Sequence, residues 1–265
     1  MDKIKLKSKR YIKTKMILNH NGLLPEHLEN QRKNFNPEKE PKLIPYNKNL
    51  WELIFPNKSG INLSDYQLTN IGVYSVINKK DSNIISKTIK SYFPKSEKLT
   101  ITDATSNMGG MVIVFGDHFD KVNAVEIVPY HCKVLEHNLS IYHPDKMNKT
   151  INIHCMDYLD VATKLNQDIV FFDPPWGGKD YINKSQIMDL YLDEIPIEKI
   201  VRLLLEKGVK LVVIRVPRNY NFVKIFSLAY QVKVDTFINQ IKKKVSYFTL
   251  YISKNDLIDK HIKGL

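Results

Sequence analysis

The sequence predicts an α/β fold with a mostly parallel sheet and helices on both faces. From residue 98 onward, short apolar segments rich in β-branched residues alternate with segments of helical periodicity. The expected strands are "LTITDA", "KVNAVEI", "TINIHCMD", "DIVFFD" and "VKLVVIRVP", with helical patterns at 129–142, 158–166 and 196–207. "VKVDTFINQ" and "VSYFTLYIS" then form a final antiparallel pair, which makes seven strands.

The bulk composition favours one domain of ordinary size with a small accessory region. The chain has 265 residues, of which 43% are hydrophobic, and this supports a real core. No apolar run is long enough to span a bilayer, and the Lys-rich N-terminus lacks a signal-peptide core, so we expect no membrane partner. Cys132 and Cys155 show no metal-ligand spacing. We therefore expect two small buried side chains, no metal, and an intracellular, reducing compartment.

The N-terminal part is expected to be organised differently from the rest. Residues 1–20 resemble a flexible basic arm, and 21–95 an irregular or helical extension with helices near 25–33, 48–55 and 82–93. Ser82 is the expected N-cap of the last of these helices. Residues 96–265 then form the α/β domain.

The net charge of +12 is concentrated near the N-terminus. Residues 1–50 carry 12 Lys and Arg against 5 Asp and Glu, which gives +7 of the +12. This basic region favours a polyanionic partner, and nucleic acid over membrane because no amphipathic stripe accompanies the charge. A solvated tail that aids solubility is the alternative.

Acidic side chains end the first four expected strands. In parallel sheets of this kind, ligands bind at the carboxyl ends of the strands. Glu126, 23 residues after Asp103, is placed to accept both hydroxyls of a ribose, and Asp157 is placed to accept from an adenine amine. For Glu126 and Asp157 the alternative is an exposed strand end without a ligand. The four acids are Asp103, Glu126, Asp157 and Asp173.

The segment "DATSNMGG" follows the first strand and precedes a helix. Gly109 lets backbone approach a ligand closely, and the helix N-terminus favours an anion such as a carboxylate. Neither a GxGxxG pattern nor a P-loop lysine is present in this segment, so a pyrophosphate site is not favoured. A nucleoside with a charged tail, S-adenosyl-L-methionine, fits these residues better than NAD.

The segment "DPPWGGKDY" ends the fourth strand. Its two prolines, Pro174 and Pro175, fix φ and shape the turn, so Asp173 and Trp176 are expected to point into the cleft. Asp173 can accept a hydrogen bond from an exocyclic amine. Trp176 offers a flat face for a base, and the best face for a cationic one. A role for Trp176 in the core alone is disfavoured by the prolines and glycines around it.

These residues resemble a known family. "DPPW" resembles the (D/N/S)-P-P-(Y/F/W) signature of S-adenosylmethionine-dependent amino-methyltransferases, and "DPPWGGKDY" is similar to the motif of trimethylguanosine synthases. "DATSNMGG", "VEIVP" and "VPRN" resemble that family's D-A-x-x-G-x-G-G, ribose-binding strand end and P-R-N. Upstream, "LWELIFPNKSG" and "GVYSV" are similar to the segments that precede its catalytic domain. The resemblance covers roughly residues 48–252 and is strongest in 103–181.

The resemblance implies a Rossmann-like class I methyltransferase that methylates the N2 amine of 7-methylguanosine RNA caps, giving di- or trimethylguanosine. It places Asp173, Pro174 and Trp176 at the catalytic position. It implies that S-adenosylmethionine is bound by Asp103, Thr105, Asn107, Gly109, Glu126, Asp157 and Asp173. It implies that the capped RNA is bound by Ser75, Trp176, Tyr181, Arg218, Asn219 and Lys48. A monomer in the nucleus or cytoplasm is expected, and the origin is left open between a cell and a large DNA virus.

Two departures from the family pattern leave its chemistry in place. Asn107 replaces the first glycine of the nucleotide loop but also tolerates left-handed backbone. Lys179 replaces a proline and adds positive charge beside the expected cap. One alternative is methylation of guanine N2 or adenine N6 at internal positions of rRNA, tRNA or DNA. Another is a cap-binding module without catalysis, against which the intact strand-end acids argue.

Overall fold

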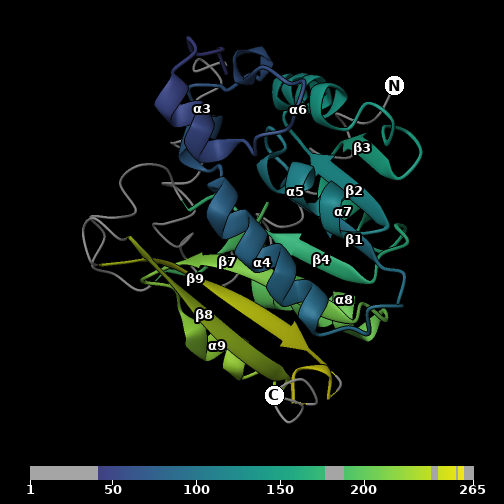
Figure 1. Ribbon diagram of the computed structural model, residues 1–265. Helices are drawn as coiled ribbons and strands as arrows, with labels where there is room; N and C mark the ends of the chain where they lie inside the picture. The colour runs from purple at the N-terminus through teal and green to yellow at the C-terminus, as the bar shows by residue number, and fades with distance from the viewer. Residues whose placement is uncertain (1–40, 177–187, 240–243, 255, 260–265) are drawn as a thin grey trace, which may run out of the picture.

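The computed structural model describes residues 41–176, 188–239, 244–254 and 256–259 (Figure 1). The expected basic arm, the helix near 25–33, and the residues Lys179 and Tyr181 lie outside these ranges. Every strand predicted from the sequence falls wholly or largely within them.

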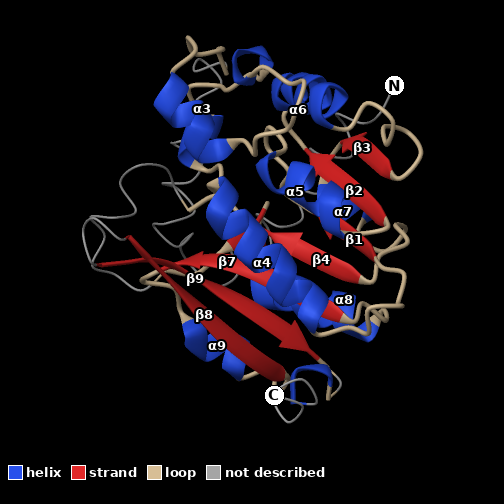
Figure 2. Cartoon of the chain, in the orientation of Figure 1, coloured by secondary structure: helices blue, strands red, loops and turns tan. Residues whose placement is uncertain are grey.

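A seven-stranded sheet forms the centre of the molecule, in the order β3-β2-β1-β4-β7-β9-β8 (Figure 2). Strands β1, β2, β3, β4 and β7 run parallel, whereas β9 runs antiparallel to both of its neighbours. The predicted fold class is therefore confirmed. The strands are β1 (Thr100–Asp103), β2 (Lys121–Glu126), β3 (Ile151–Cys155), β4 (Ile169–Phe172), β7 (Leu211–Pro217), β8 (Gln231–Asn239) and β9 (Lys244–Ser253).

Helices cover both faces of this sheet, because successive residues of the buried strands alternate between two apolar cores. On β4, Phe171 joins the first core while Val170 and Phe172 join the second. The first core is covered by α4 (Lys79–Ser91), α5 (Gly110–His118) and α6 (Pro129–Tyr142), and the second by α7 (Tyr158–Val161), α8 (Ile197–Glu206) and α9 (Phe222–Phe226). Figure 1 shows α4 lying across the sheet.

The segment before α4 packs into the first core. It contains α3 (Lys48–Ile54) and two short 3-10 turns, η1 (Leu63–Asp65) and η2 (Gly72–Tyr74). Trp51 is buried and its Nε1 donates to the Tyr66 carbonyl at 2.9 Å. Asn138 on α6 bonds both backbone groups of Gln67, at 2.8 and 3.0 Å. These contacts hold the segment that leads into η2.

Several local predictions differ from the structure. The expected N-cap Ser82 is wrong: α4 begins at Lys79, and the Asn78 side chain accepts from the backbone N–H of Asp81 at 3.0 Å. Ser82 lies inside the helix, where its hydroxyl donates to the Asn78 carbonyl at 3.0 Å. The helix expected over 158–166 ends at Val161. A small hairpin of β5 (Tyr191–Leu192) and β6 (Ile195–Pro196) was not predicted.

The prediction of two small buried cysteine side chains holds for Cys132 but is wrong for Cys155, which is exposed, and it did not include a bond between them. Cys132 on α6 and Cys155 on β3 are joined by a disulfide with their Cα atoms 5.8 Å apart. The register of the sheet explains the approach, because Cys155 lies opposite Glu126 and α6 starts three residues after Glu126. Cysteine usage therefore no longer argues for a reducing compartment. Within the described ranges, no helix is long and apolar enough to cross a bilayer.

Candidate active site

The four predicted acids lie at or just after the carboxyl ends of adjacent strands. Asp103 ends β1 and Glu126 ends β2, whereas Asp157 follows β3 by two residues and Asp173 follows β4 directly. Because β3, β2, β1 and β4 are neighbours and parallel, these ends share one edge of the sheet. The predicted placement of the acids is confirmed, and it creates a polar edge beside a buried sheet.

Asp103 is a strongly perturbed acid at this edge. Its side chain is buried, and Oδ1 accepts from the backbone N–H of Thr105 at 3.1 Å. Burial raises the pKa of Asp103 to about 8, an increase to which the nearby carboxylates of Asp173 and Glu126 also contribute. The Thr105 N–H opposes this increase in pKa without cancelling it. Asp103 is therefore largely protonated at neutral pH, and a cationic group beside it would favour its ionised form.

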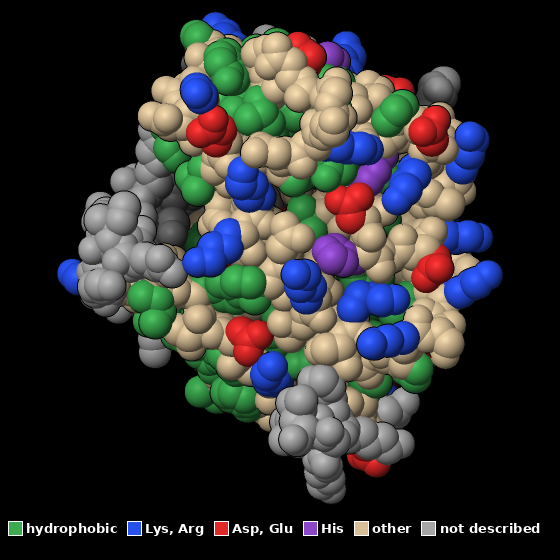
Figure 3. All heavy atoms as spheres, in the orientation of Figure 1, with side chains coloured by type: hydrophobic (Ala, Val, Ile, Leu, Met, Phe, Trp, Pro, Cys, Tyr) green, Lys and Arg blue, Asp and Glu red, His purple; other side chains and the backbone are tan. Residues whose placement is uncertain are grey.

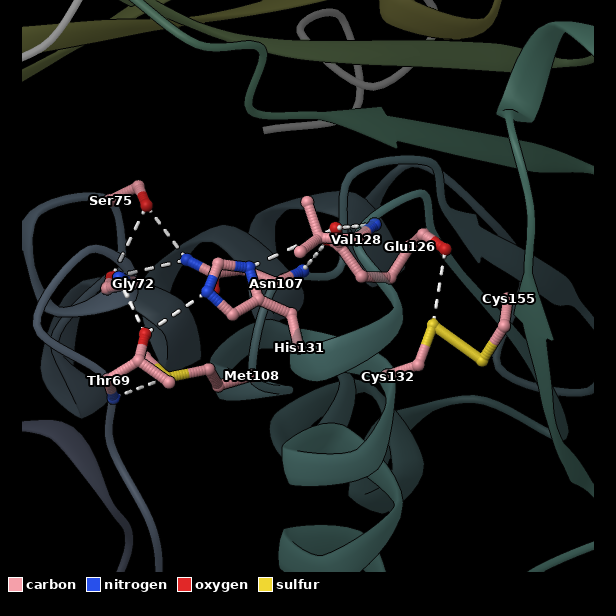
Figure 4. Close-up of polar contacts among 10 residues, drawn as sticks. All are labelled: Thr69, Gly72, Ser75, Asn107, Met108, Glu126, Val128, His131, Cys132 and Cys155. Atoms are coloured by element: carbon pink, nitrogen blue, oxygen red, sulfur yellow. Dashed lines mark hydrogen bonds and ion pairs between the residues drawn. A yellow bond between two sulfur atoms is a disulfide. The ribbon is translucent and has the colours of Figure 1, made fainter. Parts of the chain in front are cut away.

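The loop between β1 and α5 has two residues in left-handed backbone. Asn107 has φ of 49° and Gly109 has φ of 93°, so the prediction that Asn107 tolerates left-handed backbone is confirmed. A Cβ on Gly109 would lie 2.8 Å from Leu135 Cδ1, which explains why a side chain is excluded there. The Asn107 amide donates to the Gly72 carbonyl at 3.1 Å and to Ser75 Oγ at 2.8 Å (Figure 4). The loop is thus fastened to the segment around η2.

Glu126 accepts backbone hydrogen bonds at both carboxylate oxygens. Oε2 accepts from the Asn107 N–H at 2.7 Å and Oε1 from the Val128 N–H at 2.8 Å (Figure 4). Burial raises the pKa of Glu126, and these N–H groups partly offset the increase. His131 Nδ1 lies 4.0 Å from Oε1, but burial lowers the His131 pKa to about 4. The imidazole is therefore neutral at physiological pH.

These residues fit S-adenosylmethionine. Each carboxylate oxygen has two lone-pair sites, so Glu126 keeps acceptor capacity for ribose hydroxyls after its two backbone hydrogen bonds. Asp103, protonated when no cation is near, matches a ligand that carries an ammonium or sulfonium group.

A small cavity connects the loop to the turn after β4. Its lining includes Ser75, Asp103, Thr105, Asn107, Phe171 and Asp173. Thr105 Oγ1 accepts from the Asp173 backbone N–H at 2.8 Å and so fixes the start of the Asp-Pro-Pro-Trp turn. The structure therefore brings the predicted cofactor residues Asp103 and Thr105 together with the predicted catalytic acid Asp173.

Asp173 forms a buried ion pair that was not predicted. Arg215 Nη1 donates to Asp173 Oδ2 at 2.7 Å, and each side chain is 11% exposed. Because Phe172 pairs with Ile214 in the sheet, the next residue on each strand meets its neighbour. Burial raises the pKa of Asp173, and the Arg215 guanidinium partly offsets this. A lone arginine in the apolar run "LVVIRVP" was the available signal.

Arg215 also lies against two aromatic rings. Its Cζ is 4.5 Å from the ring centroid of Trp176 and 4.2 Å from that of Tyr247. Tyr247 on β9 stacks on Phe237 at 4.7 Å, and its hydroxyl donates to Asp81 Oδ2 at 2.7 Å. Trp176 is partly buried and packs against both apolar cores. Tyr247 was not predicted, because the cross-strand position of a Tyr in a late strand carries no local signal.

The remaining predicted residues have less defined places. Asp157 accepts from the Leu159 N–H at 3.0 Å and caps α7, which is a structural role that its Oδ1 already fills. Arg218 and Asn219 follow the end of β7, and the Asn219 carbonyl accepts from Met188 N at 2.8 Å. Lys48 is exposed on α3 with its Nζ 3.9 Å from Glu52 Oε1. Their binding roles stay predictions, as does that of Tyr181 outside the described ranges.

Among the described residues, no group of three or more His, Cys, Asp and Glu side chains is arranged to hold a metal ion.

Comparison with known proteins agrees with this arrangement. The family described as RNA cap guanine-N2 methyltransferase matches residues 98–259. An uncharacterized mimivirus protein is 35% identical over 165 residues, covering 61% of this chain and 64% of that protein. The trimethylguanosine synthase of Schizosaccharomyces pombe is 30% identical over 151 residues, covering 55% and 59%. That of Saccharomyces cerevisiae is 27% identical over 187 residues, covering 69% and 57%. The matches thus span about six tenths of each of these relatives.

Among solved structures, a methyltransferase-like protein from Porphyromonas gingivalis superposes with a TM-score of 0.54 at 16% identity. The alignment covers 73% of this chain and 44% of that one, and it supports the class I methyltransferase fold alone. The family match covers more than half of the chain and contains the strand-end acids, the Asp-Pro-Pro-Trp turn and Arg215. The chain belongs to the RNA cap guanine-N2 methyltransferase family.

Proposed function

We propose that this protein transfers a methyl group from S-adenosylmethionine to the N2 amine of the 7-methylguanosine cap of RNA. The observation that carries the proposal is the pairing of a buried carboxylate, Asp173, with an indole face, Trp176, where a planar cation already lies against both. An acceptor that suits this pair has an amine that would bind Asp173 and a flat cationic face that would stack on Trp176. 7-Methylguanine has both.

On the cofactor side, Glu126 would accept the ribose hydroxyls and Asp103 would face the charged tail. The left-handed loop through Asn107 and Gly109 would bring backbone amides close to the bound nucleoside. Bound S-adenosylmethionine would supply a methyl group activated by its sulfonium. The cavity between Asp103 and Asp173 links the two halves of the site, so the cofactor tail and the acceptor amine would meet there.

On the acceptor side, the chain's own task is mostly positioning. Asp173 would accept a hydrogen bond from the N2 amine and turn its lone pair toward the methyl group, while the Thr105 hydroxyl holds the Asp173 backbone. Asp173 would also stabilise the positive charge that develops on the nitrogen as the new N–C bond forms and the S–C bond of the sulfonium breaks, and it would accept the proton that the nitrogen then loses. Trp176 would stack on the base, with a preference for the cationic 7-methylated form.

Phosphates of the capped RNA would meet a basic protein. Arg218 directly follows β7, which is separated by β4 from β1 and the cofactor loop. It offers a planar guanidinium for a cap phosphate. The chain carries 40 Lys and Arg against 28 Asp and Glu. Figure 3 shows Lys and Arg side chains distributed over the face on which α4 lies, with acidic side chains between them. Such a distribution favours attraction of RNA over base-specific readout.

Two variants test the acceptor assignment. Trp176→Ala should weaken binding of 7-methyl-GTP about tenfold or more, because a stacked base contributes on the order of 1–3 kcal/mol, and should weaken GTP binding less. Trp176→Phe is the matched control that keeps a ring. Asp173→Ala should abolish methyl transfer and leave S-adenosylmethionine binding within a few-fold of the wild type.

Three outcomes separate this proposal from its alternatives. If the wild type and Trp176→Ala both bound 7-methyl-GTP as tightly as GTP, and with the same affinity as each other, the cap assignment would be wrong. Methyl transfer to uncapped rRNA, tRNA or DNA in preference to caps would favour internal guanine or adenine methylation. Cap binding without cofactor binding would favour a silent cap-binding module, and isothermal titration calorimetry with S-adenosylmethionine measures this directly.

A further inference from the structure

We propose that Trp176 and Tyr247 form the two walls of a slot for the acceptor base, and that Arg215 is the internal occupant of this slot, which the base must displace. The inference rests on the proposed function and adds to it a second base-binding residue and a competitor built into the fold. We call the space between the Trp176 and Tyr247 rings the aromatic slot.

The dimensions of the aromatic slot suit one flat group. The ring centroids of Trp176 and Tyr247 are 6.4 Å apart and their planes are tilted by 49°, so the space between the two rings is wedge-shaped. The Arg215 Cζ lies in this wedge, 4.5 Å from one centroid and 4.2 Å from the other. Both distances are typical of a guanidinium stacked on an aromatic face. The slot therefore already binds a planar cation.

The Arg215 guanidinium imitates the edge of guanine that the reaction needs. In guanine, N1, C2 and the N2 amine form a planar unit with N–H donors on one side. A guanidinium has the same planar arrangement, with a third nitrogen on its central carbon. Arg215 Nη1 donates to Asp173 Oδ2 at 2.7 Å, on the carboxylate that the N2 amine would use. With both side chains 11% exposed, the pair leaves little of this carboxylate open to a ligand. Base and guanidinium thus compete for the same acceptor.

Tyr247 is held as a fixed wall. Its ring stacks on Phe237 at 4.7 Å with an interplanar angle of 9°, and its hydroxyl donates to Asp81 on α4 at 2.7 Å. Tyr247 lies on β9 opposite Pro217 of β7. Arg215 lies on β7, so the wall and the occupant stand on adjacent strands, which Figure 1 shows side by side. A side chain fixed on one face and one edge adds rigidity that a base-binding wall requires.

Arg215 holds two parts of the site together while it occupies the slot. The same Nη1 that contacts Asp173 lies 3.3 Å from the Ser75 carbonyl, and the Ser75 hydroxyl accepts from the Asn107 amide in the cofactor loop. Movement of Arg215 would therefore free Asp173 and release one contact of the segment after η2. A positively charged base would also gain from the departure of a second positive charge from the same slot.

Substitution of Arg215 tests the competition. Arg215→Gln keeps hydrogen-bonding capacity but removes the positive charge and the planar guanidinium group. It should lower the Kd for 7-methyl-GTP about tenfold, because the state with an empty aromatic slot, which is the one that binds the base, is no longer a minor population. The gain for GTP should be smaller. Arg202→Gln, on the exposed side of α8, is the control for loss of a charge. Thermal unfolding of each variant verifies that it is folded.

Free guanidinium ion provides a chemical readout. In Arg215→Ala, guanidinium chloride at millimolar concentration should compete with 7-methyl-GTP, whereas urea, equally planar but neutral, should not. The wild type should show neither effect. Quenching of Trp176 fluorescence reports binding of a ligand in the aromatic slot. The chain has 2 tryptophans, and the other, Trp51, is buried in the core, so the signal of Trp176 is identified by its loss in Trp176→Phe.

The opposite results would overturn the inference. Weaker 7-methyl-GTP binding by Arg215→Gln, or methyl transfer by Arg215→Ala that guanidinium restores, would make Arg215 a participant in the reaction instead of a competitor. Tyr247→Leu should weaken 7-methyl-GTP binding about tenfold, whereas Tyr247→Phe, which keeps the ring, should not. If both variants changed the Kd for 7-methyl-GTP by the same factor, the ring of Tyr247 would not be a wall of the aromatic slot. If the wild type and all Arg215 variants fail to bind 7-methyl-GTP, the proposed function fails first.

Discussion

Replacing Asp103 with Asn should change how stability depends on pH. Asp103 is buried at the end of β1, and its pKa is raised from 3.8 to about 8, mainly because burial disfavours the charged form. Asn keeps a similar shape and still accepts the Thr105 N–H, but it cannot ionise. The substitution therefore isolates the free energy of burying this single charge.

The sign and size follow from the two pKa values. A carboxyl whose folded pKa exceeds its unfolded pKa binds more protons when folded, so its stabilising contribution is complete below pH 3.8 and is lost as pH rises toward 8. His131, whose pKa falls from 6.5 to about 4, has the opposite slope, but its contribution is complete above pH 6.5. Between pH 6.5 and pH 8, Asp103 should remove about 1–2 kcal/mol of unfolding free energy from the wild type.

Urea denaturation at several pH values in this window measures the effect. The unfolding free energy of Asp103→Asn minus that of the wild type should rise by about 1–2 kcal/mol from pH 6.5 to pH 8, because other titrating groups cancel in the difference. Parallel pH profiles for the two proteins would refute the reasoning. In that case Asp103 would be ionised in the folded protein, with a partner that compensates its burial.

Two further substitutions test the loop and the ribose acid. Gly109→Ala should lower the unfolding free energy by about 1–2 kcal/mol or more, because Ala is strained at positive φ and its Cβ would approach Leu135. Gly208→Ala, at a similar φ of 95° but in open space, measures the cost of the backbone conformation alone. Equal losses of unfolding free energy in the two variants would contradict the contribution of the Leu135 contact. Glu126→Gln should weaken S-adenosylmethionine binding about tenfold by calorimetry, because its amide has a single acceptor oxygen, whereas the carboxylate accepts from the Asn107 and Val128 N–H groups at both oxygens. An unchanged Kd relative to the exposed control Glu136→Gln would contradict the ribose role of Glu126.

The strand ends were predictable because a local pattern encodes them. A short apolar run followed by an acid marks both the end of a buried strand and the residue that emerges from it, as at Asp103, Glu126 and Asp173. The left-handed backbone at Asn107 was predictable for a similar reason, since few residues tolerate it. In each case the physical requirement falls on one or two adjacent residues.

Features that depend on register were not predictable. The Asp173–Arg215 ion pair exists because β4 and β7 are adjacent and pair Phe172 with Ile214, and residue order alone does not fix that register. The Cys132–Cys155 disulfide arises in the same way from the place of α6 beside β3. Asp157 illustrates a related ambiguity, because a strand-end acid can also cap the helix that follows. Sequence patterns indicated which residues reach the edge but not which of them meet.

Methyl transfer with competing acceptors tests the central claim most directly. The protein is incubated with labelled S-adenosylmethionine and, in parallel, with 7-methyl-GTP, GTP and uncapped RNA, and product masses report how many methyl groups are added. Transfer to the N2 amine of 7-methyl-GTP, with little or none to GTP or uncapped RNA, is the predicted result. Equal transfer to GTP, or transfer to uncapped RNA alone, would contradict it.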